Sequence, residues 1–195
     1  MTNDTQHSSA HPLPQYVTGE RIIIRPTTRA DAPYLHQWWN NPAIMGPSGT
    51  GDGMQNYDEA DVDAWFRRHI DNRKKEPRHF VICRRDGDQT PIGEFYISCD
   101  DRPGCVTFSI SIGDTSLWGQ GYASEAVLAY AAAVFEDNCC GAMRLDIPVN
   151  NTRAMRMAEA IGFQLEHTWA NGLKRTLILT RDAFEMRRAS LEKHS

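Results

Sequence analysis

Alternation of apolar and polar residues marks the strands in the middle of the chain. From residue 106 to residue 112, every even position is Val, Phe or Ile and every odd position is Thr or Ser. This is the two-residue period of a strand with one buried face. The β-rich segments 79–84 and 92–98 come before it, and short turns containing Asp-Gly or Pro-Gly separate the three segments. Such short turns predict an antiparallel meander.

A period of three to four residues predicts helices elsewhere in the chain. In residues 58–72 the apolar side chains fall on one stripe, and in residues 122–137 they again share one face. Further helices are expected over residues 28–39, 151–162 and 181–191. Further strands are expected over residues 21–25, 143–149, 164–168 and 175–180, the last two around the turn Asn171-Gly172. Residues 42–53 are rich in Gly and Pro and predict a loop.

The order of these elements is β-α-α-β-β-β-α-β-α-β-β-α. An antiparallel front followed by a βαβ unit predicts an α+β (mixed α/β) domain with its helices on one central, mostly antiparallel sheet. We expect residues 16–191 to form this single domain. Residues 1–15 lack the basic and apolar regions of a targeting signal, so we expect a disordered lead-in there.

Composition narrows the class of protein. The chain has 195 residues, 41% hydrophobic and 24% charged, which is typical of one globular domain. No apolar run approaches the roughly 20 residues that span a bilayer, so we expect no membrane partner. The net charge of −4 argues against a nucleic-acid partner. Five cysteines without a Cys-x-x-Cys pair indicate reduced thiols in the cytoplasm and no metal site.

Two glycines near the middle of the chain point to an anion site. Gly119 and Gly121 come just before the helix expected from Tyr122, and the first turn of a helix has amide N–H groups without partners. A pyrophosphate fits such a place, although a tight helix start with no ligand explains the same residues. No Lys or Arg lies between Gly113 and Ala142, so we expect backbone N–H groups alone to hold the anion.

Rival phosphate motifs do not fit this segment. The dinucleotide fingerprint requires a third glycine where Ser124 stands, and the P-loop requires a Gly-Lys-Ser/Thr triplet that the chain lacks.

The segment Trp118–Ala126 (WGQGYASEA) resembles the acetyl-CoA loop of the GNAT superfamily of N-acetyltransferases, closest to its Rim-type (ribosomal-protein N-terminal acetyltransferase) branch. Trp118 departs from the Arg or Gln of the family pattern. A second segment, from Asn151-Thr152-Arg153-Ala154 to Gly162-Phe163, is similar to the family's Asn-x-x-Ser…Leu-Gly-Phe motif. The resemblance covers roughly residues 16–188, and both motifs occur in the family's order.

The resemblance implies a GNAT-like fold in which the strands at 106–112 and 143–149 splay apart and acetyl-CoA lies between them. It implies that the pantetheine contacts Asn151 and follows the strand end, and that the pyrophosphate lies on the loop. On the next helix, Arg153 and Arg156 are candidates for the 3′-phosphate, and we include Arg156; a solvated helix face explains them equally well. The predicted cofactor-binding residues are Ser111, Ile112, Gly113, Trp118, Gly119, Gln120, Gly121, Tyr122, Ala123, Ser124, Asn151 and Arg156.

The usual catalytic residues of the family are absent. Thr107 stands where relatives carry a glutamate base, and Ala158 stands where many carry a tyrosine acid. We therefore predict Glu94, Asn151 and His167 as catalytic residues, with Glu94 as the base. The simpler interpretations are a surface carboxylate, a helix N-cap and a solvated histidine, respectively.

These features predict direct transfer of an acetyl group from acetyl-CoA to a primary amine. An α-amine, with a pKa of about 7.7–8.0, needs less help from a base than a lysine-like amine, so a protein N-terminus or a small α-amine is favoured. Acidic residues suggest an aminoglycoside or polyamine instead, although an acidic helix N-terminus explains them too. They are Asp52, Asp58, Glu59, Asp61 and Asp63. A non-catalytic acetyl-CoA-binding module is the third possibility, and the chain is expected to be a monomer or a homodimer.

Overall fold

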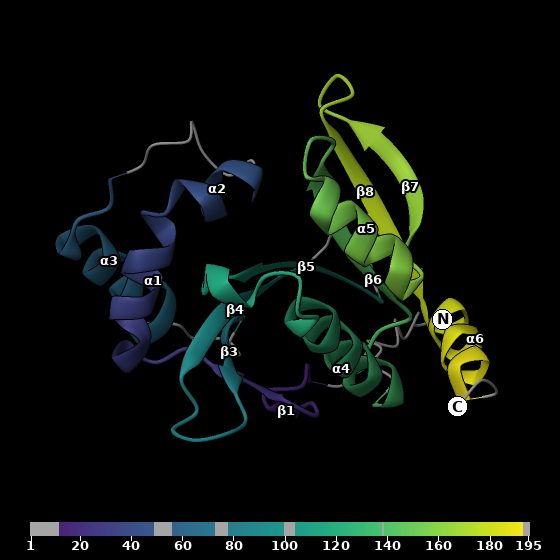
Figure 1. Cartoon of the computed structure of the whole chain (residues 1–195), viewed down its shortest axis with the longest axis horizontal. Helices are drawn as coiled ribbons and strands as arrows, with labels where there is room; N and C mark the ends of the chain where they lie inside the picture. Colours follow the sequence, from purple (N-terminus) through teal and green to yellow (C-terminus); the bar gives the residue numbers. More distant parts are fainter. Residues whose placement is uncertain (1–11, 49–55, 73–77, 100–103, 138, 193–195) are drawn as a thin grey trace, which may run out of the picture.

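A computed structural model describes residues 12–48, 56–72, 78–99, 104–137 and 139–192 of the chain (Figure 1). The strands are β1 (Val17–Thr18), β2 (Ile22–Pro26), β3 (His79–Arg84), β4 (Pro91–Cys99), β5 (Cys105–Ile112), β6 (Ala142–Pro148), β7 (Gln164–Trp169) and β8 (Lys174–Thr180). The helices are α1 (Ala32–Trp39), α2 (Pro42–Ser48), α3 (Glu59–Phe66), α4 (Tyr122–Glu136), α5 (Thr152–Ile161) and α6 (Arg181–Glu192). Short helical turns are η1 (Arg29–Asp31), η2 (Arg67–Asp71) and η3 (Thr115–Leu117).

All strands join one sheet in the order β1-β2-β3-β4-β5-β6-β8-β7. Every neighbouring pair is antiparallel except β5 and β6, which run parallel. The predicted meander of β3, β4 and β5 is confirmed, as is the predicted class of a mostly antiparallel sheet flanked by helices.

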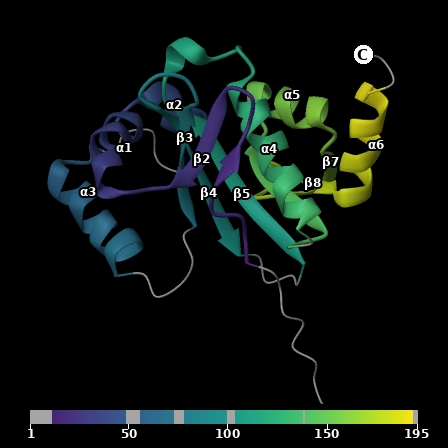
Figure 2. The same cartoon turned by 90° about the horizontal axis from the view of Figure 1, so that it is seen from below.

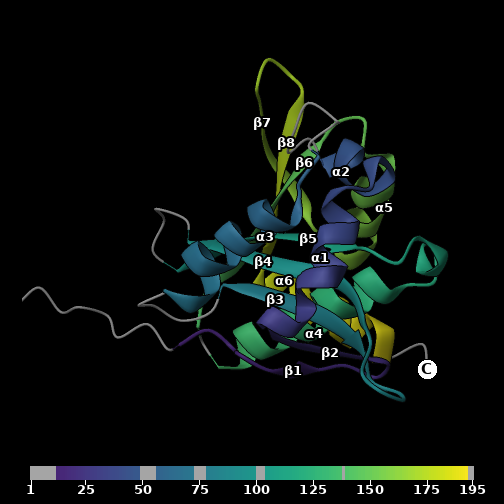
Figure 3. The ribbon, with the colours of Figure 1, turned by 90° about the vertical axis from the view of Figure 1, so that its left-hand side faces the viewer.

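Helices cover both faces of the sheet. Figure 2 shows α1 and α3 on one side of the strands and α4 on the other, and Figure 3 shows the same layers from the side. On the α4 side, Phe80 and Phe95 pack against Tyr130 to form the main core. On the other side, Trp39 and Trp65 pack together in a smaller aromatic layer. Apolar side chains therefore pack on both faces of the sheet.

The parallel pair β5–β6 separates partway along its length. The two strands are paired from Cys105 and Ala142 to Phe108 and Leu145, but no pairing follows beyond that point. β6 continues to pair with β8 up to Pro148. The second half of β5 therefore leaves an edge of the backbone open inside the sheet, as the resemblance implied.

Part of the expected loop at 42–53 is helical. Residues 42–48 form α2, because Asn41 caps its start through a hydrogen bond from the Ala43 N–H (3.0 Å) and Pro42 fits the first helical position. The prediction of a loop was wrong there, because it rested on Gly46 and Pro47, and both residues lie inside the helix. Residues 49–53 lie outside the described residues.

Two smaller differences concern the first half of the chain. The short strand β1 was not expected, and the helix beginning near Asp58 ends in a turn of π-helix, η2.

Of the expected lead-in, residues 1–11 lie outside the described part. Residues 12–15 are described, and the Pro12 carbonyl accepts a hydrogen bond from Cys139 (3.2 Å). Among the described helices, none has the length and apolar character needed to cross a membrane.

Candidate functional site

A cavity of about 630 Å³ opens where β5 and β6 separate. Its walls come from the ends of these strands, from β4, from α2, from the start of α5 and from the loop at residues 118–124, which we call the glycine loop. The predicted site residues that line the cavity are Glu94, Ser111, Ile112, Trp118, Gly119, Gly121, Tyr122, Ala123, Ser124 and Asn151. Segments far apart in the sequence thus meet at one place in the fold.

The floor of the cavity is the polar face of β4 and β5. Because side chains alternate between the two faces of a strand, directly paired residues share a face, and three such pairs line the cavity. The pairs are Glu94 with Ser111, Tyr96 with Ser109, and Ser98 with Thr107. Thr107, the position where relatives carry a glutamate, therefore faces the cavity with a side chain that cannot act as a base at neutral pH.

The glycine loop ends at a helix start with free donors. Gly121 is the N-cap of α4 with φ +84°, and Gly119 also has a positive φ of +79°, a region that only glycine enters at little cost. Within the described residues, the N–H groups of Gly121, Tyr122 and Ala123 have no recorded hydrogen-bond partner. The Trp118 indole N–H donates to the Ile112 carbonyl (2.8 Å) and fixes the loop to the end of β5.

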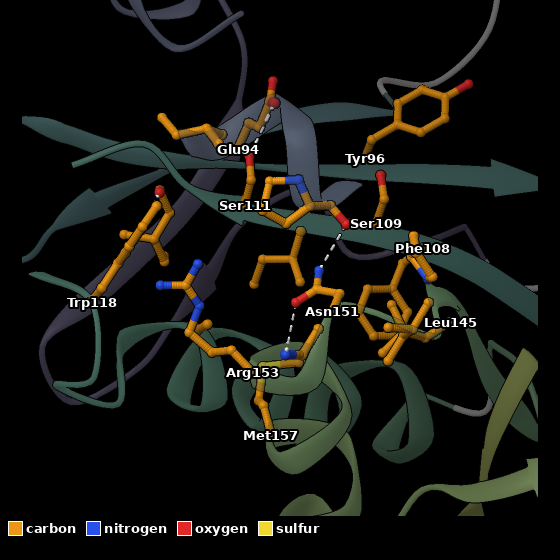
Figure 4. A pocket seen from close by; sticks show the side chains of 18 of the residues that line it. Glu94, Tyr96, Phe108, Ser109, Ser111, Trp118, Leu145, Asn151, Arg153 and Met157 are labelled. Carbon is orange, nitrogen blue, oxygen red and sulfur yellow. Dashed lines mark hydrogen bonds between the residues drawn. The ribbon is translucent and has the colours of Figure 1, made fainter. Parts of the chain in front are cut away.

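Two arginines from distant parts of the sequence flank this loop. The Arg153 guanidinium lies 3.7 Å from the ring centre of Trp118, and Figure 4 shows its side chain directed toward that ring. The Arg21 guanidinium lies 4.4 Å from the ring centre of Tyr122 and pairs with Glu125 (2.8 Å). The expectation that backbone groups alone hold the anion stays a prediction, and folding brings two guanidinium groups beside a loop that contains no Lys or Arg.

The Glu94 carboxylate is mostly buried and surrounded by donors. Its Oε2 accepts hydrogen bonds from Trp39 Nε1 and His79 Nε2, both at 3.1 Å. Its Oε1 accepts one from Ser111 Oγ at 3.1 Å, which Figure 4 shows. Burial raises the pKa of Glu94, but the hydrogen bonds from His79, Trp39 and Ser111 together lower it by a larger amount, so the net shift is downward. The carboxylate is therefore ionised at neutral pH.

Asn151 joins two walls of the cavity. Its side-chain oxygen accepts from the Ala154 N–H (3.2 Å) and caps α5, while its Nδ2 donates to the Pro47 carbonyl in α2 (3.1 Å). The simpler interpretation of Asn151 as an N-cap is thus part of the structure. The same bonds place its side chain on the cavity wall.

Four predicted site residues do not line the cavity. Gly113 packs under the Trp38 ring, and its N–H donates to the Ile92 carbonyl (2.8 Å). Gln120 bonds the Ser116 carbonyl (2.9 Å), and Arg156 is exposed on α5. His167 lies on β7 at the far edge of the sheet, with its Nε2 3.4 Å from Thr176 Oγ1, which in turn donates to the cavity residue Asp146 (2.6 Å).

The acidic residues near α3 have structural partners. Asp58 and Asp61 form a capping box at the start of α3, and Asp63 pairs with Arg29 and Arg67. None of these carboxylates lines the cavity, so the simpler interpretation of an acidic helix N-terminus describes them. Asp52 lies outside the described residues.

Sequence reasoning missed several residues of this site. His79 and the α2 residues Ile44 and Met45 carry no local motif, and Met157 was expected only as part of a helix. Among the described residues, no group of three or more His, Cys, Asp or Glu is arranged to hold a metal ion.

The sheet thus opens between two parallel strands, and free helix amides and two guanidinium groups lie at one end of the gap. Residues 21–164 match the family model described as acetyltransferase (GNAT) domain. The chain therefore belongs to the GNAT acetyltransferases, and acetyl-CoA-dependent N-acetyltransferase activity follows from that membership. No curated protein sequence matches the chain.

Solved structures of GNAT proteins share this fold. An acetyltransferase of the GNAT family from Bacillus anthracis superposes with a TM-score of 0.72 at 16% identity, over 86% of this chain and 99% of that one. Spermidine N-acetyltransferase from Vibrio cholerae, in complex with CoA and spermine, gives 0.68 at 19% identity over 85% and 98%. An aminoglycoside acetyltransferase in complex with coenzyme A gives 0.65 at 22% identity over 86% and 99%. At these identities the likeness is one of fold.

Proposed function

We propose that this acetyltransferase acts on a neutral or singly charged primary amine, favouring the α-amine of a protein N-terminus or of a small molecule. The observation that carries the proposal is the position of the buried Glu94 carboxylate on the cavity floor, beside the open edge of β5. The cytoplasm is the proposed compartment, and free thiols at Cys83, Cys105, Cys139 and Cys140 support it.

The cavity fits acetyl-CoA as the acetyl donor. The free amides at the start of α4 suit a pyrophosphate, and Arg21 and Arg153 add positive charge beside them. The unpaired half of β5 offers backbone donors and acceptors to the pantetheine arm. We assign Arg153 to the phosphates in place of Arg156, because Arg153 lines the cavity and Arg156 does not.

Glu94 supplies the base in this proposal. An amine that enters as an ammonium ion gives one proton to Glu94, and its nitrogen then attacks the thioester carbonyl of acetyl-CoA. The new C–N bond forms, the C–S bond breaks, and the thiol leaves with the second proton of the amine nitrogen. Glu94 returns its proton to solvent. General-base catalysis of this kind contributes roughly 10²–10⁴-fold in rate.

The charges of the cavity favour an acceptor with few cations. The charged side chains among its described lining residues are Glu94 and Asp146 against Arg153 and Lys174. The α2 wall beside them is apolar, with Ile44 and Met45. A polyamine or aminoglycoside carries several positive charges, and this balanced, partly apolar surface gives them few carboxylates to bind. The likeness of the glycine loop to the Rim-type branch also supports an N-terminal acceptor.

Asp146 is the one observation that favours a cationic acceptor. Its carboxylate lines the cavity and accepts from Thr176 Oγ1 (2.6 Å), which leaves acceptor capacity for a second ammonium group. We therefore retain a polyamine or an aminoglycoside as the second candidate.

A panel of acceptors tests these alternatives. The full chain is assayed with acetyl-CoA for thiol release and for product mass, using a peptide with a free α-amine, the same peptide formylated at its N-terminus but with a free lysine, spermidine, and an aminoglycoside. We expect the free α-amine peptide to have the highest kcat/KM. Equal or faster acetylation of the formylated peptide or spermidine would reject the α-amine preference. Binding of acetyl-CoA without turnover of any amine would indicate a non-catalytic module.

A further inference from the structure

His79 lies behind the carboxylate of Glu94, away from the cavity. It begins β3, is 7% exposed, and does not line the cavity. Both of its ring nitrogens have partners: Nε2 lies 3.1 Å from Glu94 Oε2, and Nδ1 lies 2.8 Å from Thr27 Oγ1. Thr27 is buried too, and its N–H donates to the His79 carbonyl (3.0 Å). The ring is therefore fixed on both edges.

The Glu94 partner determines which ring nitrogen must carry a proton. An ionised carboxylate only accepts hydrogen bonds, so Nε2 must carry the proton that points to Glu94. On the other edge of the ring, Nδ1 and the Thr27 hydroxyl lie within hydrogen-bond distance, and a hydroxyl can act there as donor or as acceptor. The resulting row of bonds runs from Thr27 through His79 to Glu94 and ends at Ser111 on the cavity floor.

The two oxygens of Glu94 are not equivalent in this row. Oε2 accepts from both His79 and Trp39, which leaves it little further capacity. Oε1 accepts only from Ser111 among the described residues, and Ser111 lines the cavity where β5 is unpaired. The donors on Oε2 thus hold the carboxylate with Oε1 toward Ser111 on the cavity floor.

We propose that His79 is a positioning residue for acetyl transfer, which donates its Nε2 proton to Glu94 and directs Oε1 of that carboxylate into the cavity. The proposal rests on the proposed role of Glu94 as base. His79 does not exchange a proton with the amine: the proton taken from the ammonium goes to Oε1, while the His79–Oε2 bond remains.

Among the residues that the structure describes, Tyr96 and His69 are the ionisable side chains with recognised contacts near this pair. From β4, Tyr96 lies 6.1 Å from His79 between ring centres. From η2, His69 stacks on Trp65, and its pKa is lowered by burial first and then by Arg68 and His79. Trp65 of α3 packs its ring 4.8 Å from His79. Loss of the His79 donor would remove one of the interactions that lower the pKa of Glu94, so that pKa would rise.

The test compares His79→Phe with His79→Gln in the pH dependence of kcat/KM for the best acceptor of the wild type. His79→Phe removes the donor, so we expect the acidic limb of the pH profile to move up by about one pH unit. Because Oε1 is then no longer held toward the cavity, we expect kcat on the neutral plateau to fall about tenfold, with an unchanged KM for acetyl-CoA. His79→Gln keeps an N–H donor and should restore most of the wild-type limb. The proposal would be overturned if both variants kept the acidic limb of the wild-type pH profile and differed from the wild type only in a lower unfolding midpoint.

A second measurement needs no variant. Nitrogen-15 NMR of the wild-type histidines should show a proton on His79 Nε2, and a ring protonated on Nδ1 alone would overturn the proposal even if the variants fail to fold. Failure of the proposed function has a different signature, because the wild type would then acetylate spermidine or the formylated peptide at least as fast as the free α-amine peptide, or would acetylate no amine at all.

Discussion

Two buried carboxylates, Asp31 in η1 and Glu94 in β4, each lie against a basic side chain. Asp31 is 2% exposed. Its carboxylate accepts hydrogen bonds from the two terminal guanidinium nitrogens of Arg25 (2.7 and 2.9 Å) and from the Thr28 N–H (2.8 Å). Burial raises the pKa of Asp31, but the hydrogen bonds from Arg25 and Thr28 lower it by a larger amount, so the net shift is downward. Glu94 shows the same balance with His79, Trp39 and Ser111.

The two carboxylates differ in the surroundings of their oxygens. The oxygens of Asp31 are taken up by its own chain segment, which does not line the cavity. Glu94 has one anchored oxygen and one that faces the cavity. A buried carboxylate beside a basic side chain therefore stabilises the fold when all its oxygens have internal partners, as in Asp31. It can also serve as a base when one oxygen faces a cavity, as we propose for Glu94.

Asp31→Asn should cause the largest loss of stability. It leaves the Arg25 cation partly buried without its partner, which costs about 3 kcal/mol of unfolding free energy. Because the folded-state pKa of Asp31 is lowered, its contribution is present above the unfolded pKa of about 3.9 and is lost as pH falls through the folded value. Urea unfolding between pH 7 and pH 3 should show a constant difference between wild type and variant at neutral pH that shrinks below about pH 4. A difference that grows on acidification would contradict the pairing.

Gly121→Ala should weaken acetyl-CoA binding about tenfold. A left-handed backbone costs a non-glycine residue roughly 1–2 kcal/mol, and about 1.4 kcal/mol corresponds to a factor of ten. Relief of that strain would turn the amides at the start of α4 away from the ligand. Gly87→Ala is the control, since Gly87 also has a positive φ (+62°) but lies in an exposed turn. Calorimetric titration should show the loss only for Gly121→Ala.

Arg153→Ala should raise the Kd for acetyl-CoA about fivefold, or about 1 kcal/mol, because it removes a cation beside the glycine loop. Arg156→Ala, on the same helix but outside the cavity, should leave that Kd unchanged. Titration with dephospho-CoA as well as acetyl-CoA shows which phosphate Arg153 contacts. Equal losses in both variants would mean that only the overall charge of the helix matters.

Asp58→Ala should have the smallest effect. Its side chain caps α3 by accepting from the Asp61 N–H (2.8 Å), and loss of such a cap costs about 1 kcal/mol of stability. The KM for spermidine or any other cationic acceptor should not change. A clear rise of that KM would return the acidic residues near α3 to the acceptor site.

The fold was largely predictable because its signals are local. The strict alternation at residues 106–112 predicted both the strand β5 and which of its faces is polar. Gly119 and Gly121 similarly predicted the turn into α4. The helix α2 was missed because Gly46 and Pro47 dominate its composition, while its start depends on a single cap by Asn41.

The site was predictable only in part, because its chemistry depends on contacts between distant segments. Glu94 was expected, but its donors Trp39 and His79 come from α1 and β3, and neither carries a motif. His167 was expected from residue type alone and lies at the far edge of the sheet, on β7. Residue type identifies candidates for such a site, whereas register and packing decide which of them face the cavity.

The most direct test compares Glu94→Gln with Asp31→Asn in kcat at saturating acetyl-CoA and pH 7. We predict that Glu94→Gln lowers kcat about 10²-fold or more while its Kd for acetyl-CoA stays at the wild-type value. We predict that Asp31→Asn keeps the wild-type kcat per folded molecule and loses only stability. A Glu94→Gln enzyme with wild-type kcat, or an Asp31→Asn enzyme that folds but does not turn over, would contradict the assignment of the two carboxylates.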